Sequence, residues 1–87
     1  MRWLDQYKRE ISTDQPVSMM YAYVPGIRVC VHRIAGTAGW YLNCPELRID
    51  AINLHTEDFK EASELAKLLI REKFGNLEVA VNNFLEN

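Results

Sequence analysis

Four residues of this 87-residue chain are of types that bind zinc: Cys30, His32, Cys44 and His55. Structural zinc sites use thiolate and imidazole ligands, usually as closely spaced pairs along the chain. Only Cys30 and His32 are close in sequence, and the set matches none of the usual spacings. We therefore expect no metal and no cofactor. The alternative roles are two structural cysteines, a surface histidine and, in His55, a residue that flanks a helix.

Cys30 and His32 also suggest cysteine catalysis, in which a nearby base activates a thiolate held in a cleft. On one strand, these two positions share a face but keep their side chains well apart. No glycine-rich turn that could hold an oxyanion adjoins them. Glu46 and Asp50 are a candidate pair of carboxylates for acid–base chemistry, but no specific signature surrounds them. We therefore expect a protein that is not an enzyme.

Gly36 and Gly39 enclose a short uncharged loop. Phosphate-binding loops are longer, and a lysine followed by serine or threonine completes them. We expect this segment to join two strands instead.

The best candidate for function is one face of a hairpin predicted over residues 17–34. The stretch Val24-Pro25-Gly26-Ile27 is typical of a turn, because proline presets φ at the second position and glycine allows a positive φ at the third. Pairing Val24 with Ile27 places apolar or small residues on one face of both strands. The other face offers aromatic and basic side chains, which are common at binding hot spots. The candidate partner-binding residues are Tyr21, Tyr23, Arg28 and His32 on this face, together with Arg33 and Tyr41, which are close to it in sequence.

The alternative is that a short N-terminal helix covers this face. Trp3, Tyr7 and Ile11 recur at helical spacing, which predicts an amphipathic helix over residues 2–11. In that case Trp3 and Tyr7 would pack on the tyrosines of the hairpin.

Two further segments have the pattern of strands. Residues 40–44 predict a third strand, in which Trp40, Leu42 and Cys44 share one face. Residues 47–54 fit a fourth strand if a bulge near Asp50 brings their apolar residues to a single face. A loop with a short edge strand is the competing interpretation.

The end of the chain predicts two helices. Thr56 is a good N-cap for an amphipathic helix over 56–74, and Gly75 is typical of the residue after a helix. A short helix over 76–85 would follow. The predicted fold class is α+β: a short N-terminal helix, a three- or four-stranded antiparallel sheet, a long helix packed on one sheet face and a short C-terminal helix.

Length and composition are those of one small globular domain spanning residues 1–87. The hydrophobic fraction is 48%, the charged fraction 25% and the net charge −2, which argues mildly against a protein that binds nucleic acid by neutralising phosphates. Residues 56–87 are the acidic part, with seven acidic and four basic residues. The start of the chain lacks the pattern of a signal peptide, and no run approaches the ~20 apolar residues that span a bilayer. We expect a cytoplasmic protein without a membrane partner.

Two families share part of this pattern. The order helix, three strands, helix resembles the double-stranded-RNA-binding domain, but the start of the last helix, Thr56-Glu57-Asp58-Phe59-Lys60, is acidic where that family has lysines. Residues 40–66 are similar to the small β-β-β-α domain of HicB-type antitoxins, without the glycine turn before the helix. Both resemblances imply regulatory or RNA-binding modules.

We expect a non-enzymatic module that binds another protein. Small acidic domains of this kind are common among phage and mobile-element inhibitors, including anti-CRISPR proteins, which occlude a functional surface of a host protein. The alternative is an RNA-binding or antitoxin-like regulatory module that uses the tyrosines and arginines of the hairpin. The apolar residues of the last helix suggest a homodimer through Leu77, Val81 and Phe84.

Overall fold

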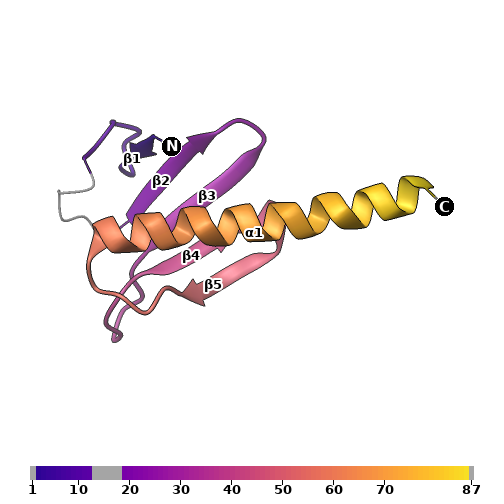
Figure 1. Ribbon diagram of the computed structural model, residues 1–87. Helices are drawn as coiled ribbons and strands as arrows, with labels where there is room; N and C mark the ends of the chain where they lie inside the picture. Colours follow the sequence, from indigo (N-terminus) through magenta and orange to yellow (C-terminus); the bar gives the residue numbers. More distant parts are fainter. Residues whose placement is uncertain (1, 13–18, 87) are drawn as a thin grey trace.

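The computed structural model describes residues 2–12 and 19–86, and it shows one antiparallel sheet with a long helix across one face (Figure 1). The five strands lie in chain order. A 3₁₀ turn, η1 (Pro45–Leu47), separates the last two strands. The other elements are β1 (Trp3–Leu4), β2 (Met19–Val24), β3 (Ile27–His32), β4 (Tyr41–Cys44), β5 (Ile49–Asn53) and α1 (Phe59–Glu86). The α+β class and the antiparallel sheet are confirmed.

The predicted pairing of the hairpin is also confirmed. Val24 pairs with Ile27 and Tyr21 with Cys30, as the turn signal implied. Gly26 has a φ of 87°, the conformation for which glycine is favoured at this point of the turn. The two strands therefore divide their residues between two faces as expected, although β3 ends at His32. Residues 13–18, where β2 was predicted to begin, lie outside the described residues.

The fourth predicted strand exists and contains the predicted bulge. Between the pairs Leu42–Ile52 and Cys44–Ile49, β5 has one residue more than β4. Ala51 lies in this irregularity with a φ of 48°. The extra residue returns Ile52 to the side of the sheet that carries Ile49, so both face the helix.

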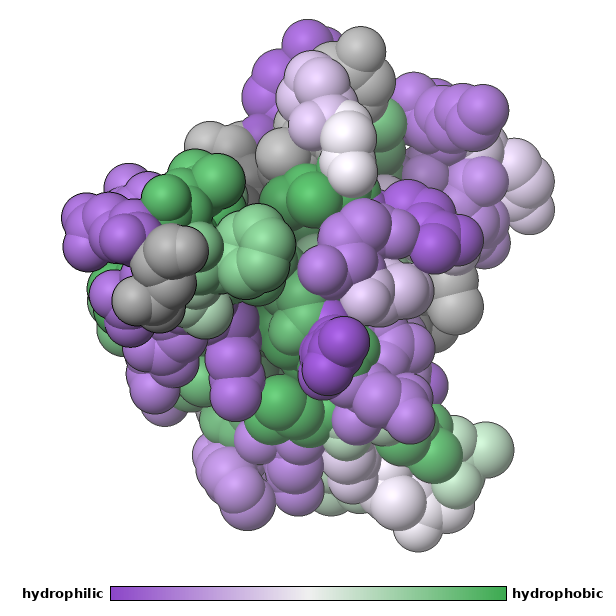
Figure 2. All heavy atoms as spheres, turned by 90° about the vertical axis from the view of Figure 1, so that its right-hand side faces the viewer, coloured by the Kyte–Doolittle hydropathy of each residue, from purple (hydrophilic) through white to green (hydrophobic). Residues whose placement is uncertain are grey.

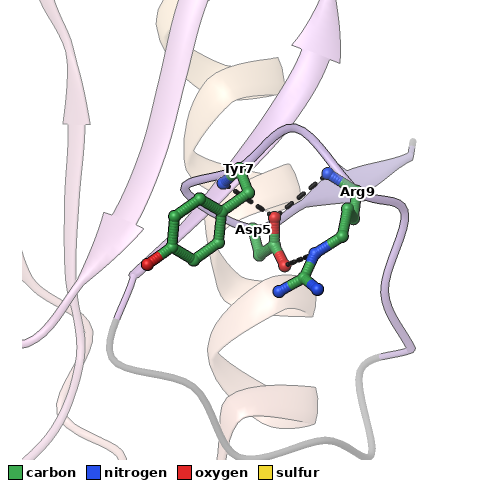
Figure 3. A network of polar contacts seen from close by, with 3 residues as sticks. All are labelled: Asp5, Tyr7 and Arg9. Carbon is green, nitrogen blue, oxygen red and sulfur yellow. Dashed lines mark hydrogen bonds and ion pairs between the residues drawn. The ribbon is translucent and has the colours of Figure 1, made fainter.

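The predicted N-terminal helix is wrong. Residues 3–4 form β1, which pairs with β2 and makes a fifth strand at the edge of the sheet. Asp5 replaces the helix by a tight turn, since its carboxylate accepts hydrogen bonds from the backbone N–H of Tyr7 (2.8 Å) and Arg9 (3.0 Å) and from Arg9 Nε (2.8 Å) (Figure 3). Tyr7 is 70% exposed, so the helical spacing of apolar residues was coincidental.

The two predicted C-terminal helices are one. α1 begins at Phe59, where the Asp58 carboxylate accepts a hydrogen bond from the N–H of Glu61, three residues later than expected. Gly75 does not end the helix, because its φ is not positive and the helix continues through it to Glu86. A helix of 28 residues is about 42 Å long, which accounts for most of the 48 Å length of the molecule.

The core lies between the sheet and the first half of α1. Phe59 is packed edge-on between two buried indoles, Trp3 at 5.6 Å and Trp40 at 4.9 Å between ring centroids. Ala62 and Ala66 let the helix approach the sheet closely. The described helices include none that is both long and apolar enough to cross a membrane.

Candidate protein-binding surface

Helix α1 covers one face of the sheet and leaves the opposite face accessible (Figure 1). We call this opposite side the outer face. Its residues alternate along the strands with core residues such as Val29, Val31 and Leu42. Tyr21 is 39% exposed, and the other described members are exposed or partly buried. We define the outer face by six residues of β2, β3 and β4: Tyr21, Arg28, Cys30, His32, Tyr41 and Asn43.

Two aromatic rings form the centre of the outer face. His32 and Tyr41 are cross-strand partners and stack, with 6.2 Å between centroids and 23° between planes. His32 Nδ1 lies 3.2 Å from the carbonyl oxygen of Arg33. Nε2 is shielded from solvent and has no hydrogen-bond partner among the described residues. The imidazole thus retains polar capacity that this part of the chain does not use.

An ion pair closes one end of the outer face. The Glu46 carboxylate accepts hydrogen bonds from the backbone N–H of Arg28 and from Arg28 Nε (2.9 Å), and Arg28 Nη2 lies 2.8 Å away. The hydrogen bond from the Arg28 N–H, followed by that from the guanidinium, holds the pKa of Glu46 below its ordinary value. η1 positions Glu46 for this contact. The guanidinium is therefore already paired with a carboxylate.

Two candidate residues are not brought into this group. Arg33 follows β3, and its guanidinium lies over the ring of Trp40 at 4.6 Å from the centroid. It shields the edge of the core instead of extending the outer face. The backbone of Tyr23 pairs with that of Arg28, but the side chain of Tyr23 lies outside the described part of the structure.

The cysteines and histidines do not converge. Cys30 lies on the outer face and Cys44 is buried on the core face, and both are free thiols. His55 is exposed beyond β5. Within residues 2–12 and 19–86, no three His, Cys, Asp or Glu side chains are placed to hold a metal ion.

The thiols are also poorly suited to nucleophilic chemistry. Burial raises the pKa of the Cys30 thiol to about 11, and burial likewise raises the pKa of Cys44. At neutral pH Cys30 is therefore almost entirely protonated, and the thiolate is the nucleophilic form. The candidate carboxylates are not arranged as an acid–base pair either, because Glu46 forms an ion pair with Arg28 and Asp50 is exposed to solvent.

The loop between the two glycines joins β3 to β4, as expected. Gly39 is required there, since its φ is 91° and a Cβ at this position would lie 3.0 Å from the carbonyl oxygen of Thr56. The same carbonyl accepts a hydrogen bond from the N–H of Trp40. The loop is thus tied to the segment before α1.

Sequence reasoning missed two features of the surface. Trp3 packs with Phe59 on the helix side of the sheet, whereas the alternative placed it on the tyrosines of the hairpin. The sequence suggests Glu46 only as an acid–base residue, whereas in the structure it is the partner of Arg28. Eighteen residues separate these two in sequence, and no local pattern indicates a contact at that distance.

The chain matches no protein-family model, and comparisons with curated proteins and with solved structures found no significant similarity.

Proposed function

We propose that this protein is a non-enzymatic module that binds another protein through the outer face of its sheet. The observation that carries the proposal is the stacked pair His32–Tyr41, which lies beside Tyr21 on a sheet face without a covering helix among the described elements. Tyrosine supplies large contact area and a polar hydroxyl together, which is why protein interfaces are enriched in it.

Charge favours a protein over a nucleic acid as the partner. Arg28 is paired with Glu46, and Arg33 lies over Trp40, so both arginines of the RNA-binding alternative are already engaged. The net charge of the chain is −2. Phosphate neutralisation by free basic side chains drives most nucleic-acid binding, and this face offers little of it.

The module would act by occlusion. A sheet face is broad and shallow, and it suits covering a surface of a larger protein better than enclosing a small ligand. Inhibition of an enzyme or complex is the most direct consequence of such covering, and we propose it as the mode of action.

The test is affinity purification of the tagged chain from host lysate, with and without nuclease. We expect one protein in stoichiometric amount in both samples. Its recovery should fall at least about tenfold for Tyr41→Ala, the loss of one hot-spot contact. Tyr7→Ala is the matched control, because Tyr7 is an exposed tyrosine of the N-terminal turn and is not one of the residues that define the outer face.

Equal recovery by the folded Tyr41→Ala variant and by the wild type would show that the outer face is not the binding surface. Recovery that depends on intact nucleic acid would favour the RNA-binding alternative instead.

A further inference from the structure

The second half of α1 carries large apolar side chains that the described structure leaves exposed. The helix packs against the core as far as Ile70, and residues 71–86 continue past the sheet (Figure 1). At 1.5 Å per residue this extension is about 24 Å long. Phe74 is 57% and Phe84 78% exposed, and smaller fractions of Leu77 and Val81 are also accessible.

These residues have the spacing of a seam between two helices. Ile70, Phe74, Leu77, Val81 and Phe84 follow one another at intervals of four, three, four and three residues. The mean interval of 3.5 residues is the repeat with which helices pack along each other as coiled coils. We call these five residues the seam.

The seam continues the face that the first half of α1 turns toward the sheet. Leu77 follows Ala66 by eleven residues, or about three turns, so the two lie on the same side of the helix. Figure 2, a view from the side to which α1 extends, shows hydrophobic residues at the helix end and in the hollow beside it. A partner that covers the seam must therefore lie on the same side of α1 as the sheet, beyond the end of the sheet.

We propose that a second copy of this chain fills this space, with its α1 antiparallel to the first. A parallel copy would have to place the first half of its own helix where the sheet of the first chain lies, which sterics forbid. An antiparallel copy enters with its C-terminal end first and keeps its own sheet at the far end. The contact is then two-fold symmetric, as is usual for homodimers.

The seam is self-complementary in this orientation. The pairing that covers its four exposed members, Phe74, Leu77, Val81 and Phe84, centres the two-fold axis at position 79, midway between Phe74 and Phe84. Phe74 then meets Phe84 of the second copy, and Leu77 meets Val81. The seven-residue repeat has two apolar positions, and in each layer a residue at the first meets a residue at the second position of the other helix. Antiparallel coiled coils need this arrangement.

Charge and area agree with this occupant. The antiparallel arrangement brings the basic start of the extension, Arg71 and Lys73, near the negative end of the helix dipole of the second copy. The exposed seam and Leu85 together offer on the order of 500 Å² of apolar surface per chain. A stable interface buries about 800 Å² per partner, of which roughly two-thirds is apolar in homodimers.

Helix propensity also calls for a covering partner. The extension contains Gly75, Asn76, Val79 and Asn82, all weak helix formers. Isolated helices of about 16 residues are marginal in water even with better sequences. Packing against a second helix would stabilise this segment.

The test compares two identical substitutions on opposite sides of the helix, in the full-length chain. Val81→Glu lies in the seam, whereas Val79→Glu, at a 59% exposed valine two residues earlier, lies on the other side. By sedimentation equilibrium we expect a wild-type dimer. Val81→Glu should raise its dissociation constant about 1000-fold, because each hot-spot loss of about 30-fold counts twice at a two-fold axis, and Val79→Glu should leave it unchanged.

A second pair of variants tests the orientation. Near the axis, Glu78 lies close to Glu78 of the second copy, so Glu78→Gln should tighten the dimer about twofold. In a parallel dimer Glu78 would instead face Lys73 of the other chain, and the same change would weaken association. Glu72→Gln, on the opposite side of the helix, is the control for loss of charge.

The proposal is overturned if the wild-type chain is still a monomer at about 100 μM, which is roughly 100 times the dissociation constant of a micromolar dimer. Dimerisation that survives Val81→Glu, or that Glu78→Gln weakens, also overturns it. These outcomes are separate from the proposed binding function, because Tyr41 of the outer face and Val81 of the seam lie on different elements. Either surface can fail without the other.

Discussion

Trp3 and Trp40 allow a matched test of how buried polar groups contribute to the stability of this fold. Both indoles are buried, and both pack edge-on against Phe59. They differ at Nε1 and in the guanidinium of Arg33, which lies over the ring of Trp40. Trp40 Nε1 donates a hydrogen bond to the carbonyl oxygen of Glu57 at 3.1 Å, whereas Trp3 Nε1 has no partner among the described residues. Replacing each by phenylalanine removes the same atoms from similar surroundings.

The difference between the two variants can be estimated from this contrast. Trp40→Phe loses a hydrogen bond, a net cost of about 1 kcal/mol. Trp3→Phe removes a buried N–H without a partner and relieves a penalty of about 1 kcal/mol or more. The loss of edge-on packing against Phe59 is common to both and cancels, and any weakening of the contact between Arg33 and the ring at position 40 adds to the cost of Trp40→Phe. We therefore expect Trp40→Phe to be less stable than Trp3→Phe by about 2 kcal/mol.

The assay is urea unfolding followed by far-ultraviolet circular dichroism, with the free energy of unfolding taken at equal m-values. A domain of this length has a stability of roughly 4–13 kcal/mol, so both variants should remain folded. If Trp3→Phe proved as costly as Trp40→Phe or more so, the reasoning from hydrogen-bond satisfaction would be refuted. Unequal m-values would instead indicate that the substitutions changed the unfolded state.

Three further outcomes are expected. Gly75→Ala should stabilise α1 by about 0.5–1 kcal/mol, because a helical glycine costs that much relative to alanine. The added Cβ would meet no atom within 4 Å, and thermal unfolding measures the gain in stability. The pKa of Asp5 is lowered from 3.8, chiefly by the hydrogen bond that its carboxylate accepts from the Arg9 N–H. The ionised Asp5 therefore contributes its full share of folding stability above pH 3.8, and this share is lost as the pH falls through the lower pKa of the folded state. Acid titration of the tryptophan fluorescence should show this step, and Asp5→Asn should remove it. Because the pKa of Cys30 is about 11, its alkylation at pH 8 should be about 100-fold slower than that of a free cysteine, as measured by mass spectrometry; a rapid reaction would contradict the buried thiol.

Local patterns were enough to predict the centre of the fold. The turn at Pro25-Gly26 sets the register of β2 and β3, since a one-residue shift would exchange every core residue for an outer one. The bulge in β5 was also readable, because the apolar residues change sides between Ile49 and Ile52 and only an inserted residue can realign them. Alternation along a strand is a property of neighbouring residues, and the sequence contains it directly.

Long-range contacts decided the remaining features. A helix over residues 2–11 and a strand at Trp3 were both compatible with the sequence, and the pairing of β1 with β2 selected the strand. The single helix α1 passes through Gly75 because a glycine ends a helix only when it adopts a positive φ. The contact between Arg28 and Glu46 depends on η1 folding back across β3. The same contact neutralises the charge of Arg28 on the outer face. Such choices are made by groups distant in the chain that meet only after folding, so the residues around each of them carry no sign of the outcome.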